Sequence, residues 1–157
     1  MKDQPSLQQH LLSLLLDLDG IQQDHRFHPE GDALYHSLQV FQVALQNTDN
    51  PILLSAALFH DVGKVYGSKN HDKLGAEMLT GLLNNQIIWL IEHHLDLLKK
   101  PIRTRKNLRH NRLKLISLQN LRKWDLAGRN PYADVLSPEQ AISTLFKTRG
   151  IASIYHE

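Results

Sequence analysis

The sequence contains no cysteine and only two methionines and two tryptophans, and it has no long apolar run. Without thiolates it can form neither a disulfide framework nor a cysteine-ligated zinc site. The longest leucine-rich stretch, residues 11–18, is interrupted by Ser13 and Asp17, whereas a membrane-spanning helix needs about 20 apolar residues. These absences predict a soluble, cytoplasmic protein with no membrane partner.

The charge of the chain is nearly balanced, with 18 Lys and Arg against 16 Asp and Glu and a formal net charge of +2. This balance argues against a molecule that binds polyanions over its whole surface. A length of 157 residues and a hydrophobic content of 41% are typical of one globular domain. We therefore predict a single domain over residues 1–157, and the sequence gives no signal for its oligomeric state.

Apolar residues recur at helical spacing along the chain, and no alternating strand pattern occurs. Capping-box sequences at Ser6 and Ser137 predict the starts of an N-terminal helix (6–19) and a C-terminal helix (138–149), both packed on a core at about 28–130. The other predicted helices cover about residues 32–45, 51–62, 71–79 and 86–98, and one ends near 125. The pattern predicts a compact all-α bundle of about seven helices.

Histidine is abundant, with ten residues in 157. Five of them, together with two aspartates, fall where the apolar pattern predicts burial on five separate helices. These seven residues are His36, His60, Asp61, His71, His93, His94 and Asp125. Another four histidines lie in polar contexts and are predicted at the surface: His10, His25, His110 and His156.

Buried imidazoles and carboxylates are costly, roughly several kcal/mol each when they have no partner. A domain whose stability is about 5–15 kcal/mol cannot carry seven such groups scattered through its core. Gathered around one or two divalent cations, the seven groups would satisfy one another. The sequence therefore predicts a metal centre built from these residues.

Taken singly, each residue also allows a structural interpretation. A lone inward histidine is more often a hydrogen-bonded core residue than a ligand. His93 and His94 could be one core and one surface residue, because adjacent helical positions differ by about 100°. Asp125 could simply pair with Arg122 or Arg129. The joint pattern favours the metal centre.

Residues 57–64, Ala-Leu-Phe-His-Asp-Val-Gly-Lys, resemble the defining motif of the HD-domain superfamily of metal-dependent phosphohydrolases. Upstream, residues 28–32 and His36 resemble the start of the HD domain attached to some bacterial CCA-adding tRNA nucleotidyltransferases. Asp125 takes the place of the closing aspartate of these domains. The resemblance covers about residues 28–130.

Two further elements match binuclear members of the superfamily. His71 and Gly75 match an HxxxG element, and His93-His94 match the paired histidines of the HD-GYP phosphodiesterases. No Gly-Tyr-Pro element follows the pair, so the resemblance does not extend to cyclic-di-GMP as substrate.

The resemblance implies two groups of metal ligands. His36, His60, Asp61 and Asp125 would hold a first ion, and His71, His93 and His94 would hold a second, with Asp61 bridging. Nitrogen and oxygen ligands suit one or two divalent transition-metal ions: Mn, Fe, Co, Ni or Zn. Magnesium fits less well, because it prefers oxygen ligands and water.

The same resemblance implies a phosphohydrolase that cleaves phosphomono- or phosphodiester bonds by metal-activated hydroxide. The substrate would be a nucleotide or a related small phosphorylated molecule. Asp61 would orient the nucleophile, Lys64 would act in catalysis and contact the substrate phosphate, and Arg129 would also bind substrate. Lys64 could equally be a solvated lysine at a helix end.

Other functions fit parts of the pattern. A mononuclear nucleotidase would use only the first group of ligands. An HD module could hold metal for ligand sensing or interaction without turnover. A nucleic-acid partner for the basic stretch 103–112 is possible but not favoured, because this stretch lacks interleaved aromatic residues and is more simply a solvated face.

Overall fold

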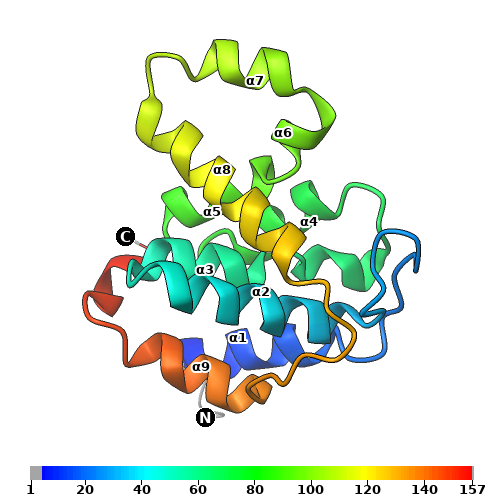
Figure 1. Cartoon of the computed structure of the whole chain (residues 1–157). Coiled ribbons are helices and arrows are strands. Elements are labelled where there is room, and N and C mark those ends of the chain that lie inside the picture. The colour runs from blue at the N-terminus through cyan, green and yellow to red at the C-terminus, as the bar shows by residue number, and fades with distance from the viewer. Residues whose placement is uncertain (1–4, 157) are drawn as a thin grey trace.

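The computed structural model describes residues 5–156, which form helices and isolated bridges but no strand (Figure 1). The helices are α1 (Leu7–Leu16), α2 (Ala33–Asn47), α3 (Pro51–Phe59), η1 (Val62–Tyr66), α4 (His71–Leu79), α5 (Asn85–His93), α6 (Asp96–Lys99), α7 (Pro101–Asn107), α8 (Arg112–Ala127), α9 (Pro138–Phe146) and η2 (Ile151–Ile154). The all-α prediction is confirmed. Within residues 5–156, no helix combines the length and the apolar character that crossing a bilayer requires.

The predicted capping boxes form at both ends of the chain. The Ser6 hydroxyl accepts a hydrogen bond from the Gln9 amide, and the Gln9 side chain accepts one from the Ser6 amide. Ser137 and Gln140 make the same reciprocal pair at the start of α9. Each box satisfies two amides that the first helical turn leaves without partners.

The segment between residues 86 and 112 differs from the prediction. The single helix expected over 86–98 is divided into α5 and α6, with the interruption at His94 and Leu95. Pro101 does not simply end a helix but occupies the first position of α7, where its missing N–H leaves no intrahelical bond unmade. The described residues therefore contain more helices than the seven predicted.

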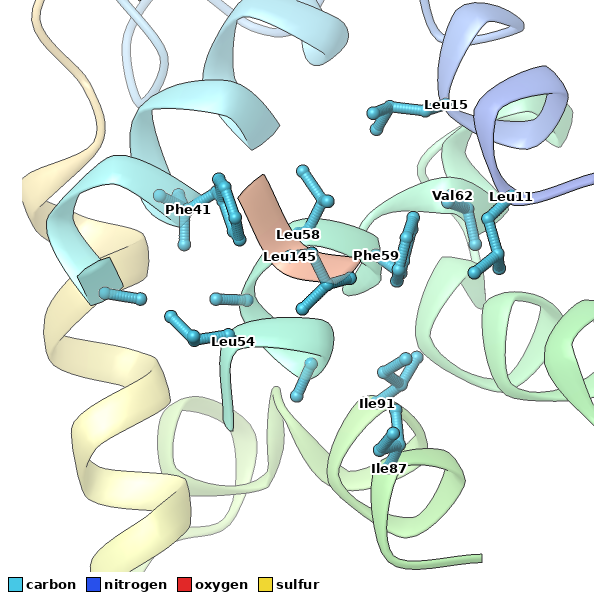
Figure 2. Close-up of a cluster of buried hydrophobic side chains, with 14 of the residues drawn as sticks. Leu11, Leu15, Phe41, Leu54, Leu58, Phe59, Val62, Ile87, Ile91 and Leu145 are labelled. Atoms are coloured by element: carbon cyan, nitrogen blue, oxygen red, sulfur yellow. The ribbon is translucent and has the colours of Figure 1, made fainter. Parts of the chain in front are cut away.

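The apolar helix α3 lies at the centre of the core, against α2, α5, α8 and η2. Figure 2 shows the cluster of buried side chains to which it contributes. Leu54, Leu58 and Phe59 of this helix have at most 1% of their surface exposed. They are surrounded by side chains of neighbouring helices, such as Phe41 and Ile91. Because α3 is apolar on all sides, it can only be stable inside the protein. Its C-terminal end therefore carries the residues that follow it, 60 and 61, into the interior.

The N-terminal and C-terminal helices pack together on one side of this core. Leu11, Leu15 and Leu18 of the predicted apolar stripe are fully buried, and α1 contacts α9, which also contacts α2 and α3. In Figure 1 these two helices lie below α2 and α3, whereas α4, α5 and α8 lie above them. The predicted ligands meet on the side of the core that α4, α5 and α8 form.

Candidate metal centre

The Asp61 carboxylate lies between two pairs of histidines. Its Oδ2 is 3.3 Å from His60 Nε2 and 3.6 Å from His36 Nε2. Its Oδ1 is 3.2 Å from His71 Nε2 and 3.6 Å from His94 Nε2. All five residues are buried, although they come from four separate parts of the chain. The structure therefore places four of the seven predicted ligands around a fifth, the Asp61 carboxylate.

These side chains form two sets of potential ligand atoms, in each of which all atoms lie within 4.8 Å of one another. One set is His36, His60 and Asp61, and the other is Asp61, His71 and His94. Asp125 adjoins the first set, because its Oδ1 is 2.8 Å from His36 Nε2 and 3.6 Å from His60 Nε2. The grouping matches the two positions that the resemblance implies, except that His93 belongs to neither set.

The backbone fixes which nitrogen each of these imidazoles presents. In all four histidines, Nδ1 lies 2.6–2.8 Å from a carbonyl oxygen, and a carbonyl can only accept a hydrogen bond. The pairs are His36 with Gly128, His60 with Ala57, His71 with Ser68, and His94 with Ile91. Each Nδ1 must therefore carry a proton, which leaves Nε2 as the nitrogen that can bind a metal ion.

Two of the converging nitrogen atoms have no hydrogen-bond partner among the described residues. His60 Nε2 and His94 Nε2 are both buried without such a partner, and Asp61 Oδ2 is neighboured by the Lys64 ammonium group at 3.0 Å. Buried polar atoms without a partner are rare because each costs stability. Imidazole nitrogens and carboxylate oxygens are together the donor set of divalent transition-metal sites. The residues present therefore fit the metal that was predicted.

Gly63 allows the two ligand-bearing segments to approach each other. A Cβ atom at this position would collide with the carbonyl oxygen of His71 and lie 2.7 Å from the amide nitrogen of Gly75. Only glycine permits η1 and the start of α4 to pack this closely. The approach places Asp61, just before η1, beside the first residue of α4.

Gly128 has the same role at the other end of the centre. A Cβ here would lie 2.6 Å from Val40 Cγ2 and 2.9 Å from the Val40 amide nitrogen. The missing side chain lets the end of α8 meet α2, so that the Gly128 carbonyl reaches His36 Nδ1. The sequence pattern did not single out this residue, although Gly128 directly follows a predicted helix.

The charges of the centre are strongly coupled. Burial disfavours the charged form of Asp61, but the charges of His60 and Lys64 beside it hold the pKa of its carboxyl well below the usual value. Burial alone would lower the pKa of His60, but Asp61 and Asp125 outweigh it and raise this pKa to about 10. In the protein without a cation, the imidazole of His60 therefore carries the positive charge that balances the carboxylates.

The centre lies at the base of a cleft of about 640 Å³. Asp61, His71 and His94 form its floor, and the exposed side chains of Phe27 and Leu98 lie at its walls. The cleft is also lined by four cationic side chains, those of Lys64, Lys99, Arg122 and Arg129. A volume of this size fits a small organic ligand, and the cations favour an anionic one.

Lys64 is a buried residue of the site and not a solvated lysine at a helix end. Only 6% of its surface is exposed, and its Nζ lies 3.0 Å from Asp61 Oδ2 and donates a hydrogen bond to Gln23 Oε1. Gln23 is held in turn by the carbonyl oxygen of Gly31, which accepts from its Nε2 at 3.3 Å. The ammonium group is therefore fixed beside the candidate metal ligands and faces the cleft.

Arg129, predicted to bind substrate, lines the cleft but is also anchored. Its Nη1 donates to the carbonyl oxygen of Phe27 at 2.7 Å, and its Nη2 lies 3.7 Å from Asp125 Oδ1. Arg122, which the sequence analysis considered only as a partner of Asp125, also lines the cleft, with its Nη1 3.6 Å from Asp125 Oδ2. Two arginines therefore flank this carboxylate on the cleft side.

His93 is the one predicted ligand that the structure places outside the cluster. Its Nδ1 lies 2.7 Å from Asp96 Oδ2, and its ring packs against Trp89 at a centroid distance of 4.6 Å. The physical reason is that adjacent positions of a helix point about 100° apart, so both histidines cannot face Asp61. Of the two adjacent histidines, only His94 therefore lies in the cluster around Asp61.

A carboxylate that the sequence analysis did not identify lies behind the centre. Glu30 is buried, with its Oε1 2.6 Å from His28 Nδ1 and 3.4 Å from His36 Nδ1, and its Oε2 has no partner among the described residues. His28, Glu30 and His36 form a third set of potential ligand atoms. The four histidines predicted at the surface, His10, His25, His110 and His156, are all exposed.

Comparison with known proteins agrees with this geometry. The model of the HD domain family matches residues 33–141, more than two thirds of the chain. A bifunctional uridylyltransferase/uridylyl-removing enzyme of Haemophilus influenzae is 33% identical over 99 residues, which cover 57% of this chain and 10% of that enzyme. This chain thus corresponds to only a small part of that relative. The chain belongs to the HD-domain family, which is part of a superfamily of metal-dependent phosphohydrolases.

Proposed function

We propose that this protein is a metal-dependent phosphohydrolase that cleaves a phosphomonoester or phosphodiester bond of a nucleotide or a related small phosphorylated molecule. The observation that carries the proposal is the orientation of four histidines. Each presents Nε2 toward Asp61 because a backbone carbonyl holds its Nδ1. Such an arrangement is preorganised for cations and would be costly to maintain without them.

Two positions for cations follow from the geometry. His36, His60 and Asp61, with Asp125 beside them, would hold one ion, and Asp61, His71 and His94 would hold the other. When bound, such ions polarise phosphoryl oxygens and make water a stronger nucleophile at neutral pH. We expect Mn, Fe, Co, Ni or Zn, because imidazole nitrogens are less suited to Mg.

The remaining side chains of the cleft would bind and orient the substrate. The ammonium group of Lys64 would donate hydrogen bonds to a phosphate oxygen above Asp61. Arg122 and Arg129 present further donors at the same opening, so they would hold a second anionic group or the leaving side of the ester. These fixed cations would stabilise charge that develops on the phosphoryl oxygens.

Two observations support a nucleotide as the substrate. Phe27 and Leu98 have 61% and 55% of their surfaces exposed at the walls of the cleft, where they offer an apolar surface to a base. The name of the similar enzyme of Haemophilus influenzae includes the removal of a uridylyl group, which is a nucleotide unit.

A substrate screen tests the proposal. Nucleoside mono-, di- and triphosphates, 2′,3′-cyclic nucleotides and a generic phosphodiester should be incubated with the protein and Mn, Co, Ni, Zn or Mg in parallel. We expect hydrolysis with at least one transition metal, lost in Asp61→Asn and retained in Asp49→Asn, which alters an exposed aspartate. Binding of a phosphorylated ligand that raises the melting temperature but is never cleaved would instead indicate a sensing module.

A further inference from the structure

The positive charge of this protein is concentrated in one short segment. Residues 99–114 contain eight of the 18 Lys and Arg and none of the 16 Asp and Glu. The rest of the chain is consequently net acidic, so the small overall charge conceals two regions of opposite sign. A separation of charge of this kind is typical of proteins with a polyanionic partner.

The basic segment, defined as residues 99–114, leaves its charges exposed and unneutralised. Within residues 5–156, no carboxylate lies at ion-pair distance from any of its cations. All eight cations are exposed: Lys99, Lys100, Arg103, Arg105, Lys106, Arg109, Arg112 and Lys114. Elsewhere on the described chain, Arg26, Lys64, Arg122 and Arg129 each lie near a carboxylate, and the other five cations, Lys69, Lys73, Lys123, Lys147 and Arg149, are unpaired but scattered along the sequence. The segment therefore offers free cations to an external anion.

The basic segment is an ordered part of the fold. Its residues form the end of α6, the whole of α7 and the start of α8, which lie at the opposite end of the molecule from α9 (Figure 1). The buried Thr104 anchors α7, because its hydroxyl donates to the carbonyl oxygens of Lys100 at 2.8 Å and Asp96 at 3.3 Å. The cations are thus presented from a fixed helical scaffold.

The basic segment is continuous with the cleft. Lys99 and Arg122 both line the cleft. Arg122 belongs to α8, and the first turn of this helix carries Arg112 and Lys114 of the basic segment. A chain of phosphates bound along α7 could therefore extend to the opening above Asp61. This continuity relates the charged surface to the site without requiring that the bound chain be cleaved.

We propose that the basic segment binds the sugar-phosphate backbone of a nucleic acid. A chain of phosphates suits a cluster of exposed lysines and arginines without carboxylate partners among the described residues, and its binding releases counterions from the nucleic acid. The segment contains no Phe, Tyr or Trp on which bases could stack, so binding should depend mainly on backbone charge and not on sequence.

An anionic membrane surface fits the same charges less well. Membrane-surface helices insert a continuous apolar face, whereas α7 has seven residues and exposes one large apolar side chain, Ile102. The next exposed apolar residue, Leu113, belongs to α8. The described structure of this segment therefore favours the nucleic acid.

Fluorescence anisotropy with a labelled 20-nucleotide RNA, and with single-stranded and duplex DNA of the same length, tests the proposal. The variant Arg103→Glu/Lys106→Glu reverses two exposed charges of α7. The control Lys147→Glu/Arg149→Glu makes the same change of net charge beyond the end of α9. We expect the Kd to rise about tenfold or more in the first variant and less than twofold in the control. The slope of log Kd against log salt should fall by about two only in the first.

Melting temperatures and hydrolysis of a small substrate should be unchanged in both variants, which separates this proposal from the proposed function. Equal weakening by the two variants would overturn the proposal, because only net charge would then matter. Absence of binding to all three nucleic acids at low salt would also overturn it. Cosedimentation with phosphatidylserine vesicles without nucleic-acid binding would assign the segment to a membrane surface instead.

Discussion

His94 faces the Asp61 carboxylate, with its Nε2 3.6 Å from Oδ1, whereas the adjacent His93 turns away and lies 2.7 Å from Asp96. We therefore predict that His94→Ala lowers kcat/KM by about 100-fold or more and reduces the metal content, because it removes a ligand. His93→Ala should retain the activity within about threefold. Elemental analysis and steady-state kinetics of the two variants measure the difference, and equal losses would contradict the geometry.

Asp61→Asn should remove bound metal from both positions at once. The amide preserves the size of the side chain but not the charge that the cations require. Metal analysis after purification without chelator should give less than half of the wild-type content, and hydrolysis should be undetectable. Wild-type metal content in this variant would show that the carboxylate is not shared.

Lys64→Met should reduce kcat without removing the metal. The substitution keeps the buried aliphatic stem but deletes the ammonium group that lies 3.0 Å from Asp61 Oδ2. Loss of one fixed donor to a phosphoryl group typically lowers kcat by about 10²-fold. Lys69→Met, at an exposed position, serves as the control and should behave as wild type. A wild-type kcat for the Lys64 variant would exclude a catalytic role.

Gly63→Ala should destabilise the protein by about 3 kcal/mol, because the new methyl group would collide with the backbone of His71 and Gly75. Gly20→Ala is a useful comparison, since it meets no atom within 4 Å but has a φ of +83°. It should cost only the left-handed backbone strain, about 1–2 kcal/mol. Urea unfolding of both variants measures the two free energies of unfolding. Gly63→Ala should be the more destabilising of the two, and the opposite order would contradict the predicted collision.

The metal-free protein should lose stability as the pH rises. In the unfolded chain His60 titrates near pH 6.5, whereas Asp61 and Asp125 outweigh burial in the folded protein and raise its pKa to about 10. The folded state then holds the additional proton, so this stabilisation is complete below pH 6.5 and is lost toward pH 10.

Melting temperatures of chelator-treated protein should therefore decline between pH 6.5 and 10, and His60→Gln should flatten this dependence. A melting temperature that stays constant or rises across this range in the wild type would show that His60 is not protonated in the metal-free state.

Much of the helical architecture could be predicted because its signals are local. The capping boxes at Ser6 and Ser137 and the apolar spacing of α1, α2 and α4 depend on residues within a few positions of one another. The buried candidate ligands could be identified because a charged or imidazole side chain at an apolar helical position needs a partner. The apolar residues at helical spacing around such a side chain indicate that it is buried.

The remaining features depend on contacts that the sequence does not encode locally. The choice between His93 and His94 follows from the rotation of α5 about its axis, which packing on α3 and α4 determines. Glu30 and Gln23 lie in a loop without periodicity, so nothing indicated that both would be buried beside the metal ligands. Gly128 became important only when α8 met Val40 of α2.

Because one carboxylate serves both sets of histidines, the two cation positions cannot be separated by changing Asp61. A form that holds a single ion could arise only by replacing side chains that belong to one set, such as His71 and His94. Such a double variant would keep His36, His60 and Asp125 intact. Either ion would therefore be lost alone through substitutions within its own set of histidines, whereas a change at Asp61 would affect both.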